Sequence, residues 1–297
     1  MCRSILVPLD GSVFSEHALP LALALVRRSG AQLHLAHVLP LRGAVGSGMV
    51  GRATATGRAA YLEQLAQQVA HQTGRAPITS VLSGPVVETL LDYARAARCD
   101  LLVLTTHGRG ALSRLWLGSV ADAMVRRSPA PVILVRPKDS LARPVTAELP
   151  FRRVLIPLDG SPLAEAIIEY SIRIGQIMDA EYTLLRVVDP AVLGVPMADE
   201  DAIDPAALQP LQYRAQTYLD RQSDEFRARG LRVDTIVTVG VPATAILGYA
   251  RAHSIDLIAM ATHGRGGFSR LLLGSVADKV LRGSSTPLLL HSPGAHG

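Results

Sequence analysis

The sequence predicts an α/β protein made of two similar domains, each with a five-stranded, doubly wound parallel sheet. Three observations support this fold class. The chain has 297 residues, more than a single hydrophobic core usually holds. One half of the chain repeats the other, and in both halves short apolar runs alternate with helical patterns. Strands that are apolar on both faces are typical of parallel sheets covered by helices on each side.

The internal repeat defines the domains. RSILVPLDGS at 3–12 matches RVLIPLDGS at 153–161, and THGRGALSRLWLGSVAD at 106–122 matches THGRGGFSRLLLGSVAD at 262–278. Residues 136–150 contain three prolines, which disfavour regular structure. We therefore expect a first domain at 1–137, a linker at 138–150 and a second domain at 151–297.

The secondary structure follows from the same alternation. Apolar runs predict strands at 5–9, 33–38, 78–82, 101–105 and 131–135 in the first copy, and at 154–158, 182–188, 234–239, 257–261 and 287–291 in the second. Helices should lie between them, and Ser161-Pro162 is a helix start signal. The stretches 41–58 and 189–210 are rich in glycine or in acids and prolines, so both are expected to be mobile, lid-like loops.

Composition argues against several classes of protein. The net charge is +5 with few aromatic residues, and the arginines are scattered, so nucleic-acid binding is disfavoured. Cys2 and Cys99 have no disulfide or metal spacing, and no apolar run is long enough to span a membrane. A cytoplasmic location is therefore expected.

A candidate anion site follows the fourth strand of each copy. Gly108 and Gly110 let the backbone approach a ligand, and Gly118-Ser119 lies near a helix N-terminus, where free amides favour an anion. The alternative is that these glycines only form turns and that Ser119 caps the helix. Asp10, and Asp159 in the second copy, end the first strand and are placed either to accept hydrogen bonds from a ribose or to cap a turn.

Together, VPLDGS, THGRGALSRLWLGS and SPAPVILVR resemble the universal stress protein family, as a tandem member with Rossmann-like, adenine nucleotide alpha hydrolase-like domains. The resemblance covers both halves and implies ATP binding where the first and fourth strands meet. It assigns the phosphates to glycines and serines, the adenosine to aspartates and the adenine face to valines. With the neighbouring loop residues, the implied sites are Asp10, Val38, Thr105, His107, Gly108, Arg109, Gly118 and Ser119, and Asp159, Val187, Ala261, His263, Gly264, Arg265, Gly274 and Ser275.

The sequence shows no clear machinery for rapid ATP hydrolysis. It contains no G-x-x-x-x-G-K-[ST] motif, and Arg109 and Arg265 are the cations nearest the site. His107 and His263 are single histidines, so neither binds a metal alone, although magnesium can bridge phosphates through water. An ATP-binding regulatory module is the favoured function; a slow ATPase or phosphotransferase and a nucleotide-free structural stress protein remain alternatives.

The final strand of each copy is short and apolar, so it should be a sheet edge that needs cover. The resemblance implies that this strand pairs with its twin across a dimer. In a tandem chain the two halves can pair as a pseudo-dimer. The sequence indicates neither whether the chain also forms a homodimer nor which proteins it binds.

The two copies depart from the family pattern at its first glycine, which is Thr105 in one and Ala261 in the other. The branched threonine hinders close approach of a ligand more than alanine does. We therefore predict that the second site binds ATP at least as tightly as the first. Calorimetric titration of Gly118→Asp and Gly274→Asp variants measures each site, and an equal loss from both would count against the prediction.

Overall fold

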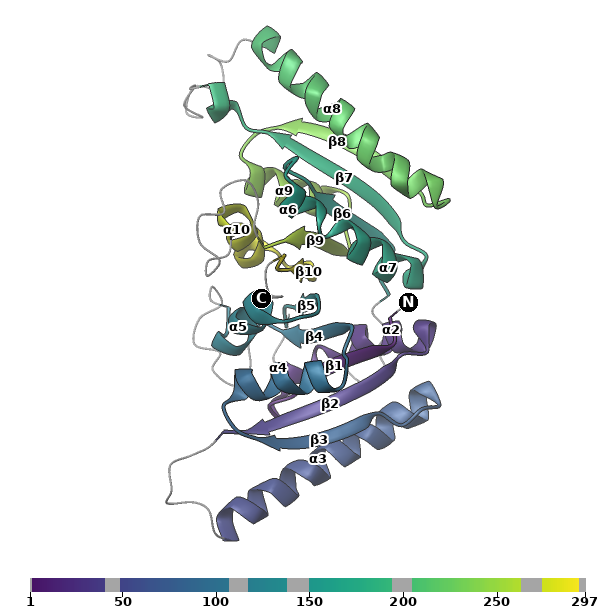
Figure 1. Ribbon diagram of the computed structural model, residues 1–297, viewed down its shortest axis with the longest axis vertical. Coiled ribbons are helices and arrows are strands. Elements are labelled where there is room, and N and C mark those ends of the chain that lie inside the picture. Colours follow the sequence, from purple (N-terminus) through teal and green to yellow (C-terminus); the bar gives the residue numbers. More distant parts are fainter. Residues whose placement is uncertain are drawn as a thin grey trace. The chain divides into compact units, whose positions relative to one another are not determined.

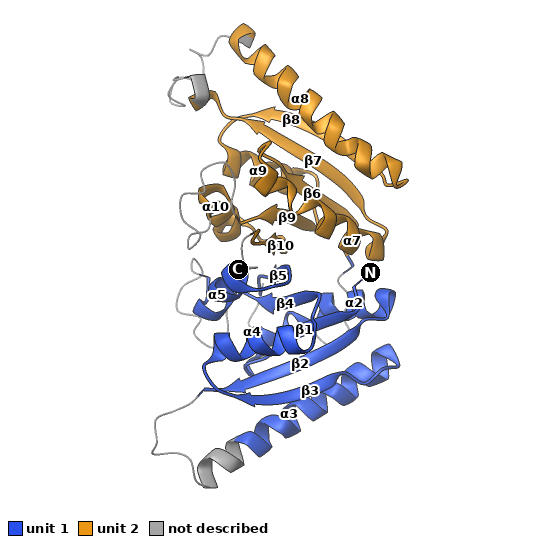
Figure 2. Cartoon of the chain, viewed as in Figure 1, with its two compact units in different colours: residues 1–150, 294–297 blue, residues 151–293 orange. Residues whose placement is uncertain are grey.

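The computed structural model describes residues 2–40, 49–106, 117–137, 150–193, 205–262 and 274–293. The chain divides into two compact units, with the boundary between Pro150 and Phe151 (Figure 2). The predicted linker, 138–150, lies outside the described residues except for Pro150. Its limits therefore stay a prediction.

Each unit is an α/β domain in which strands and helices alternate (Figure 1). Unit 1 contains β1 (Ser4–Pro8), α1 (Val13–Glu16), α2 (Leu19–Ser29), β2 (Gln32–Leu39), α3 (Met49–Thr73), β3 (Ile78–Ser83), α4 (Val86–Ala96), β4 (Leu101–Thr105), α5 (Ser119–Arg127) and β5 (Val132–Val135). Unit 2 contains β6 (Arg153–Pro157), α6 (Pro162–Glu165), α7 (Ile168–Met178), β7 (Glu181–Val188), the 3-10 helix η1 (Pro190–Leu193), α8 (Pro205–Ala228), β8 (Val233–Val239), α9 (Pro242–Ala252), β9 (Leu257–Ala261), α10 (Ser275–Gly283) and β10 (Leu288–His291).

Both sheets are parallel and doubly wound, as predicted. The strand order is β3-β2-β1-β4-β5 in unit 1 and β8-β7-β6-β9-β10 in unit 2. The central strands are almost wholly buried, because helices cover both faces of each sheet. The winding reverses between β1 and β4, and between β6 and β9. Ligands of such folds bind beyond the carboxyl ends of the strands at this reversal.

Two predicted loops are partly helical. Helix α3 begins at Met49 and α8 at Pro205, so the later parts of 41–58 and 189–210 belong to long helices, and η1 occupies the start of the second stretch. The mobile-loop expectation is wrong for these parts. Alanines in both stretches favour helix. In α3, the long helical segment that follows also extends the helix toward its N-terminus, so that it includes Gly51 and Gly57.

An aspartate joins the starts of the two central strands in each unit. Asp100 Oδ2 accepts hydrogen bonds from the amides of Arg3 and Ser4, at 2.5 and 3.1 Å. In unit 2, Asp256 Oδ2 accepts from the amides of Arg152 and Arg153, at 2.8 and 3.0 Å. These bonds hold β1 beside β4, and β6 beside β9, at the end opposite the candidate site.

Replacing Asp256 by Ala is expected to lower the free energy of unfolding by about 1–3 kcal/mol, because two amides lose a charged acceptor. The measurement is the shift of the urea unfolding midpoint. Asp224→Ala is the matched control, since Asp224 forms an exposed ion pair with Arg227 at 3.5 Å and its loss should change stability by less than about 1 kcal/mol. Equal shifts in the two variants would contradict the strand-joining role.

Candidate functional site

The first wall of the site is the turn after β1. Asp10 Oδ1 accepts hydrogen bonds from the amide and hydroxyl of Ser12, at 2.8 and 2.5 Å, and Gly11 has a φ of 77°, which glycine adopts without strain. In unit 2, Asp159 makes the same contacts with Ser161, at 2.9 and 2.6 Å. The turn-capping interpretation of both aspartates is therefore confirmed, and a hydrogen bond to ribose stays a prediction.

The second wall is the start of helix α5. Gly118 is the N-cap, and its amide donates to the carbonyl of Thr106 at 2.7 Å. Thr106 in turn donates to the carbonyl of Val135 at 3.0 Å. Gly118 therefore lies beside Thr106, at the carboxyl end of β4. The alternative in which Ser119 caps the helix is wrong, since Ser119 is the first helical residue.

Unit 2 has the same two backbone hydrogen bonds. The amide of Gly274 donates to the carbonyl of Thr262 at 2.6 Å, and Thr262 donates to the carbonyl of His291 at 2.9 Å. Gly274 is the N-cap of α10, and Ser275 is its first residue. The predicted second-site residues Gly274 and Ser275 therefore occupy the same structural positions as their counterparts in unit 1.

The amides after Gly118 are the donors that the predicted anion site requires. The first intrahelical bond is donated by Asp122 to the carbonyl of Gly118, at 2.9 Å. The amides of Ser119, Val120 and Ala121 therefore have no acceptor within the helix, and the helix dipole adds partial positive charge. Asp122 pairs with Arg126 through two bonds of 2.9 and 2.8 Å, which offsets its negative charge near this end.

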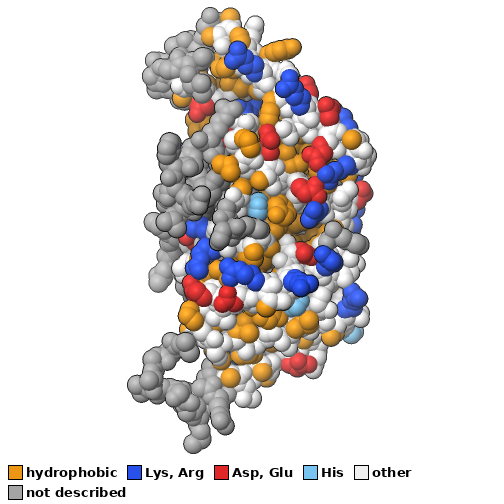
Figure 3. Space-filling model, viewed as in Figure 1, with side chains coloured by type: hydrophobic (Ala, Val, Ile, Leu, Met, Phe, Trp, Pro, Cys, Tyr) orange, Lys and Arg blue, Asp and Glu red, His pale blue; other side chains and the backbone are white. Residues whose placement is uncertain are grey.

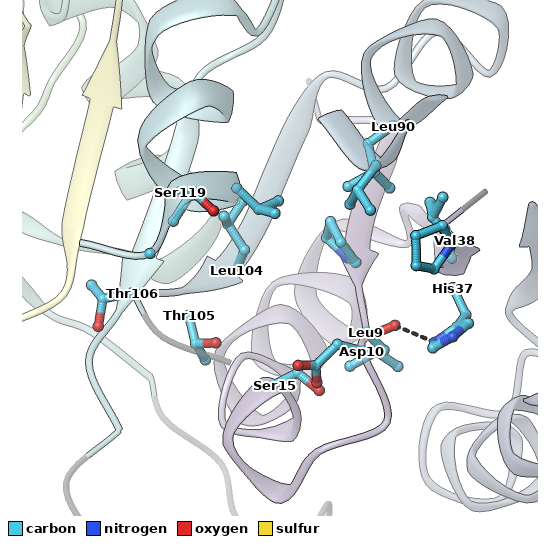
Figure 4. A pocket seen from close by; sticks show the side chains of 17 residues that line it. Leu9, Asp10, Ser15, His37, Val38, Leu90, Leu104, Thr105, Thr106 and Ser119 are labelled. Carbon is cyan, nitrogen blue, oxygen red and sulfur yellow. Dashed lines mark hydrogen bonds between the residues drawn. The ribbon is translucent and has the colours of Figure 1, made fainter. Parts of the chain in front are cut away.

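A pocket of about 510 Å³ lies between these two walls in unit 1 (Figure 4). Its volume falls within the range of small-molecule sites. Ser119 stands at the start of α5, across the pocket from Val38 at the end of β2. The labelled apolar lining residues are Leu9, Val38, Leu90 and Leu104, and the labelled polar ones are Asp10, Ser15, His37, Thr105, Thr106 and Ser119.

The structure brings together five residues predicted for the first site: Asp10, Val38, Thr105, Gly118 and Ser119 all line the pocket. In unit 2, Asp159 follows β6, Val187 lies near the end of β7, and Ala261 ends β9. The remaining predicted residues lie outside the described part of the chain: His107, Gly108, Arg109, His263, Gly264 and Arg265.

Among the polar residues that line the pocket, Ser15, His37 and Thr106 were not predicted. His37 is buried, and its Nδ1 lies 2.8 Å from the carbonyl of Leu9. Because a carbonyl only accepts, Nδ1 carries the proton of this bond. The sequence signal that could have identified His37 was its position, since it directly precedes Val38 at the end of a strand.

A tyrosine from the long helix of each unit is anchored near the aspartate turn. Tyr61 donates to Glu16 Oε1 at 2.8 Å, and Tyr218 donates to Glu165 Oε1 at 2.9 Å. Burial raises the pKa of both hydroxyls, and the bonded carboxylate raises it further. The tyrosines therefore remain neutral donors at physiological pH and tie α3 to α1, and α8 to α6.

Charges on the described surface are mixed in sign. On the face shown in Figure 3, acidic and basic side chains are interspersed. Several arginines form ion pairs, such as Arg127 with Glu88 at 2.8 Å and Arg229 with Glu169 at 2.9 Å. Across the described residues no cluster of three or more potential metal ligands occurs, and no helix combines the length and apolarity that a membrane span requires.

Comparison with known proteins identifies the family. The sequence profile described as the universal stress protein family matches residues 1–136 and 150–291. The chain belongs to the universal stress protein family. A universal stress protein of Mycobacterium tuberculosis is 30% identical over 211 residues, which cover 71% of this chain and 66% of that relative. Another, from Methanocaldococcus jannaschii, is 30% identical over 141 residues, covering 47% of this chain and 81% of its own length.

Solved structures show the same fold over the whole length. A universal stress protein from Archaeoglobus fulgidus matches with a TM-score of 0.71 and 20% identity, covering 98% of both chains. A second structure, described as a putative universal stress protein from Pseudomonas aeruginosa, has a TM-score of 0.68 and 18% identity, covering 98% of this chain and 94% of the other. The fold of the chain is thus shared with solved structures.

The Tyr61–Glu16 contact is expected to couple in a double-mutant cycle. Tyr61→Phe and Glu16→Gln should each destabilise this universal stress protein, and the double variant should lose less than their sum by about 1–2 kcal/mol, because the bond has a charged acceptor. Urea unfolding measures all three variants. Tyr213→Phe is the control, since Tyr213 is 75% exposed. Additive losses would show that the two side chains do not stabilise each other.

Proposed function

We propose that this protein is an ATP-binding regulatory module with one nucleotide site in each unit. The observation that carries the proposal is the pocket of unit 1. It places the unpaired amides of α5 opposite an apolar wall, with the carboxylate of Asp10 between them along the ends of β1 and β4. An anion, a hydroxyl-bearing sugar and an aromatic base are the chemical parts that such a pocket accommodates.

Each part of the nucleotide then has a proposed neighbour. The phosphates meet the amides of Ser119, Val120 and Ala121, and the adenine packs against Val38 and the apolar residues of α4. The ribose donates its hydroxyls to Asp10, whose Oδ1 is already held by the turn. Gly108 and Gly264 would complete the phosphate contacts, and magnesium would enter with the phosphates, coordinated through their oxygens and water.

We infer binding rather than rapid turnover. Among the described residues that line the unit 1 pocket, none is lysine or arginine, so no described cation is placed to neutralise charge that develops on a γ-phosphate. Slow ATP hydrolysis or phosphotransfer is the second candidate. It predicts product in excess over protein, abolished when both sites are blocked.

The experiment is calorimetric titration of the whole chain with ATP and magnesium, beside mass spectrometry of small molecules released from denatured protein. Gly118→Asp should abolish binding at unit 1, because it places a negative charge where the phosphates are expected. The φ of −61° at Gly118 suits any L-residue, so folding should be retained. Gly118→Asn is the matched control, with the same shape and no charge, and should bind more tightly than Gly118→Asp.

Folded wild-type protein that gives no heat with millimolar ATP and magnesium, and that releases no nucleotide, would overturn this proposal. The nucleotide-free structural role would then stand. Binding that is weakened equally by Gly118→Asn and Gly118→Asp would contradict the assignment of the phosphates to the start of α5.

A further inference from the structure

The two sites differ at one position beside the aspartate turn. The residue before Val38 is His37, and the residue before Val187 is Arg186. Each side chain reaches the carbonyl of the residue that precedes the site aspartate. His37 Nδ1 lies 2.8 Å from the carbonyl of Leu9, and Arg186 Nη1 donates to the carbonyl of Leu158 at 3.3 Å. The same place at the sheet end therefore holds an imidazole in unit 1 and a guanidinium in unit 2.

Arg186 is held in this place by the anchored tyrosine of unit 2. Its guanidinium carbon lies 5.6 Å from the centroid of the Tyr218 ring, within the range of a cation–π contact. Tyr218 is itself oriented by its bond to Glu165. Both Arg186 and Asp159 are close enough to Tyr218 to affect the pKa of its hydroxyl, in opposite directions. The guanidinium thus lies next to the Asp159 turn in a defined orientation.

Unit 1 keeps the tyrosine and both acids, and among its described residues His37 stands in the place of Arg186. Tyr61 donates to Glu16 near Asp10, as Tyr218 does to Glu165 near Asp159. Among the described residues in these contacts, the charged side chains are Asp10 and Glu16 in unit 1, and Asp159, Glu165 and Arg186 in unit 2. The loops after the fourth strands carry matching arginines in both copies, whereas the loops after β2 and β7 differ in charge, with Arg42 in the first and several acids in the second. The effect of Arg186 is therefore assessed within unit 2.

We propose that Arg186 is a specificity-determining residue that makes the unit 2 site favour nucleotides over nucleosides, because it holds a permanent positive charge beside the Asp159 turn. This inference rests on the proposed function. A guanidinium remains charged at all physiological pH values, and an additional unit charge within about 8–10 Å of a phosphate in a partly solvated site changes affinity about three- to tenfold. A neutral nucleoside gains little from it.

The test isolates each site within the full chain. Gly118→Asp leaves unit 2 as the binding site, and Gly274→Asp leaves unit 1. In the Gly118→Asp protein, Arg186→Met should weaken ATP binding about three- to tenfold and change adenosine binding less than about twofold, whereas Arg186→Lys should retain most of the ATP affinity. In the Gly274→Asp protein, His37→Arg should tighten ATP binding. Calorimetry at low and physiological salt measures each dissociation constant, and circular dichroism checks folding.

The outcomes separate the two proposals. If neither single-site protein nor the wild type binds ATP, the proposed function fails and this inference fails with it. If ATP binds but Arg186→Met has no effect, or weakens ATP and adenosine equally, charge selection by Arg186 is wrong while the proposed function stands. Should Arg186→Met not fold, Arg186→Gln takes its place, with the same expected loss of ATP affinity and the same small change for adenosine. Equal changes for the two ligands overturn the inference.

Discussion

The candidate site depends on one backbone hydrogen bond in each unit, from the amide of Gly118 to the carbonyl of Thr106 and from Gly274 to Thr262. This bond sets the start of the following helix beside the end of the fourth strand. Because the fourth strand pairs with the first, the helix start also lies near the aspartate turn. In unit 1 the start of α5 and the carboxylate of Asp10 thereby line the same pocket.

Other contacts hold the central strands and the long helices in place around the candidate site. Asp100 and Asp256 join the central strands at their amino ends, and Tyr61 and Tyr218 attach the long helices to the segments that follow the aspartates. The two copies retain these contacts although α3 and α8 have little sequence in common. The repeated contacts therefore identify the parts of the domain on which the geometry of the sheet end relies.

Sequence patterns predicted most of the fold and part of the site. Buried parallel strands are uniformly apolar, so each of the ten predicted strands is present, and the repeat indicated which strand ends carry the pocket. The helical starts at 49–58 and at 205–210 were missed because glycine and proline suggest loops, whereas packing of the long helices overrides local propensity. His37 and Arg186 were missed because they lie outside the repeated motifs PLDGS and THGRG, on which the predicted sites were based.

The backbone at the two N-caps has an evolutionary consequence. Gly118 and Gly274 have φ values of −61° and −57° with ψ of 145°, a conformation open to every L-amino acid. In the proposed complex, a side chain introduced there meets the nucleotide, while the backbone keeps a conformation that every L-residue adopts. After a gene duplication, one copy can therefore lose or exchange its ligand through a single codon change while its sheet persists as a scaffold, so divergence of tandem copies need not pass through an unstable intermediate.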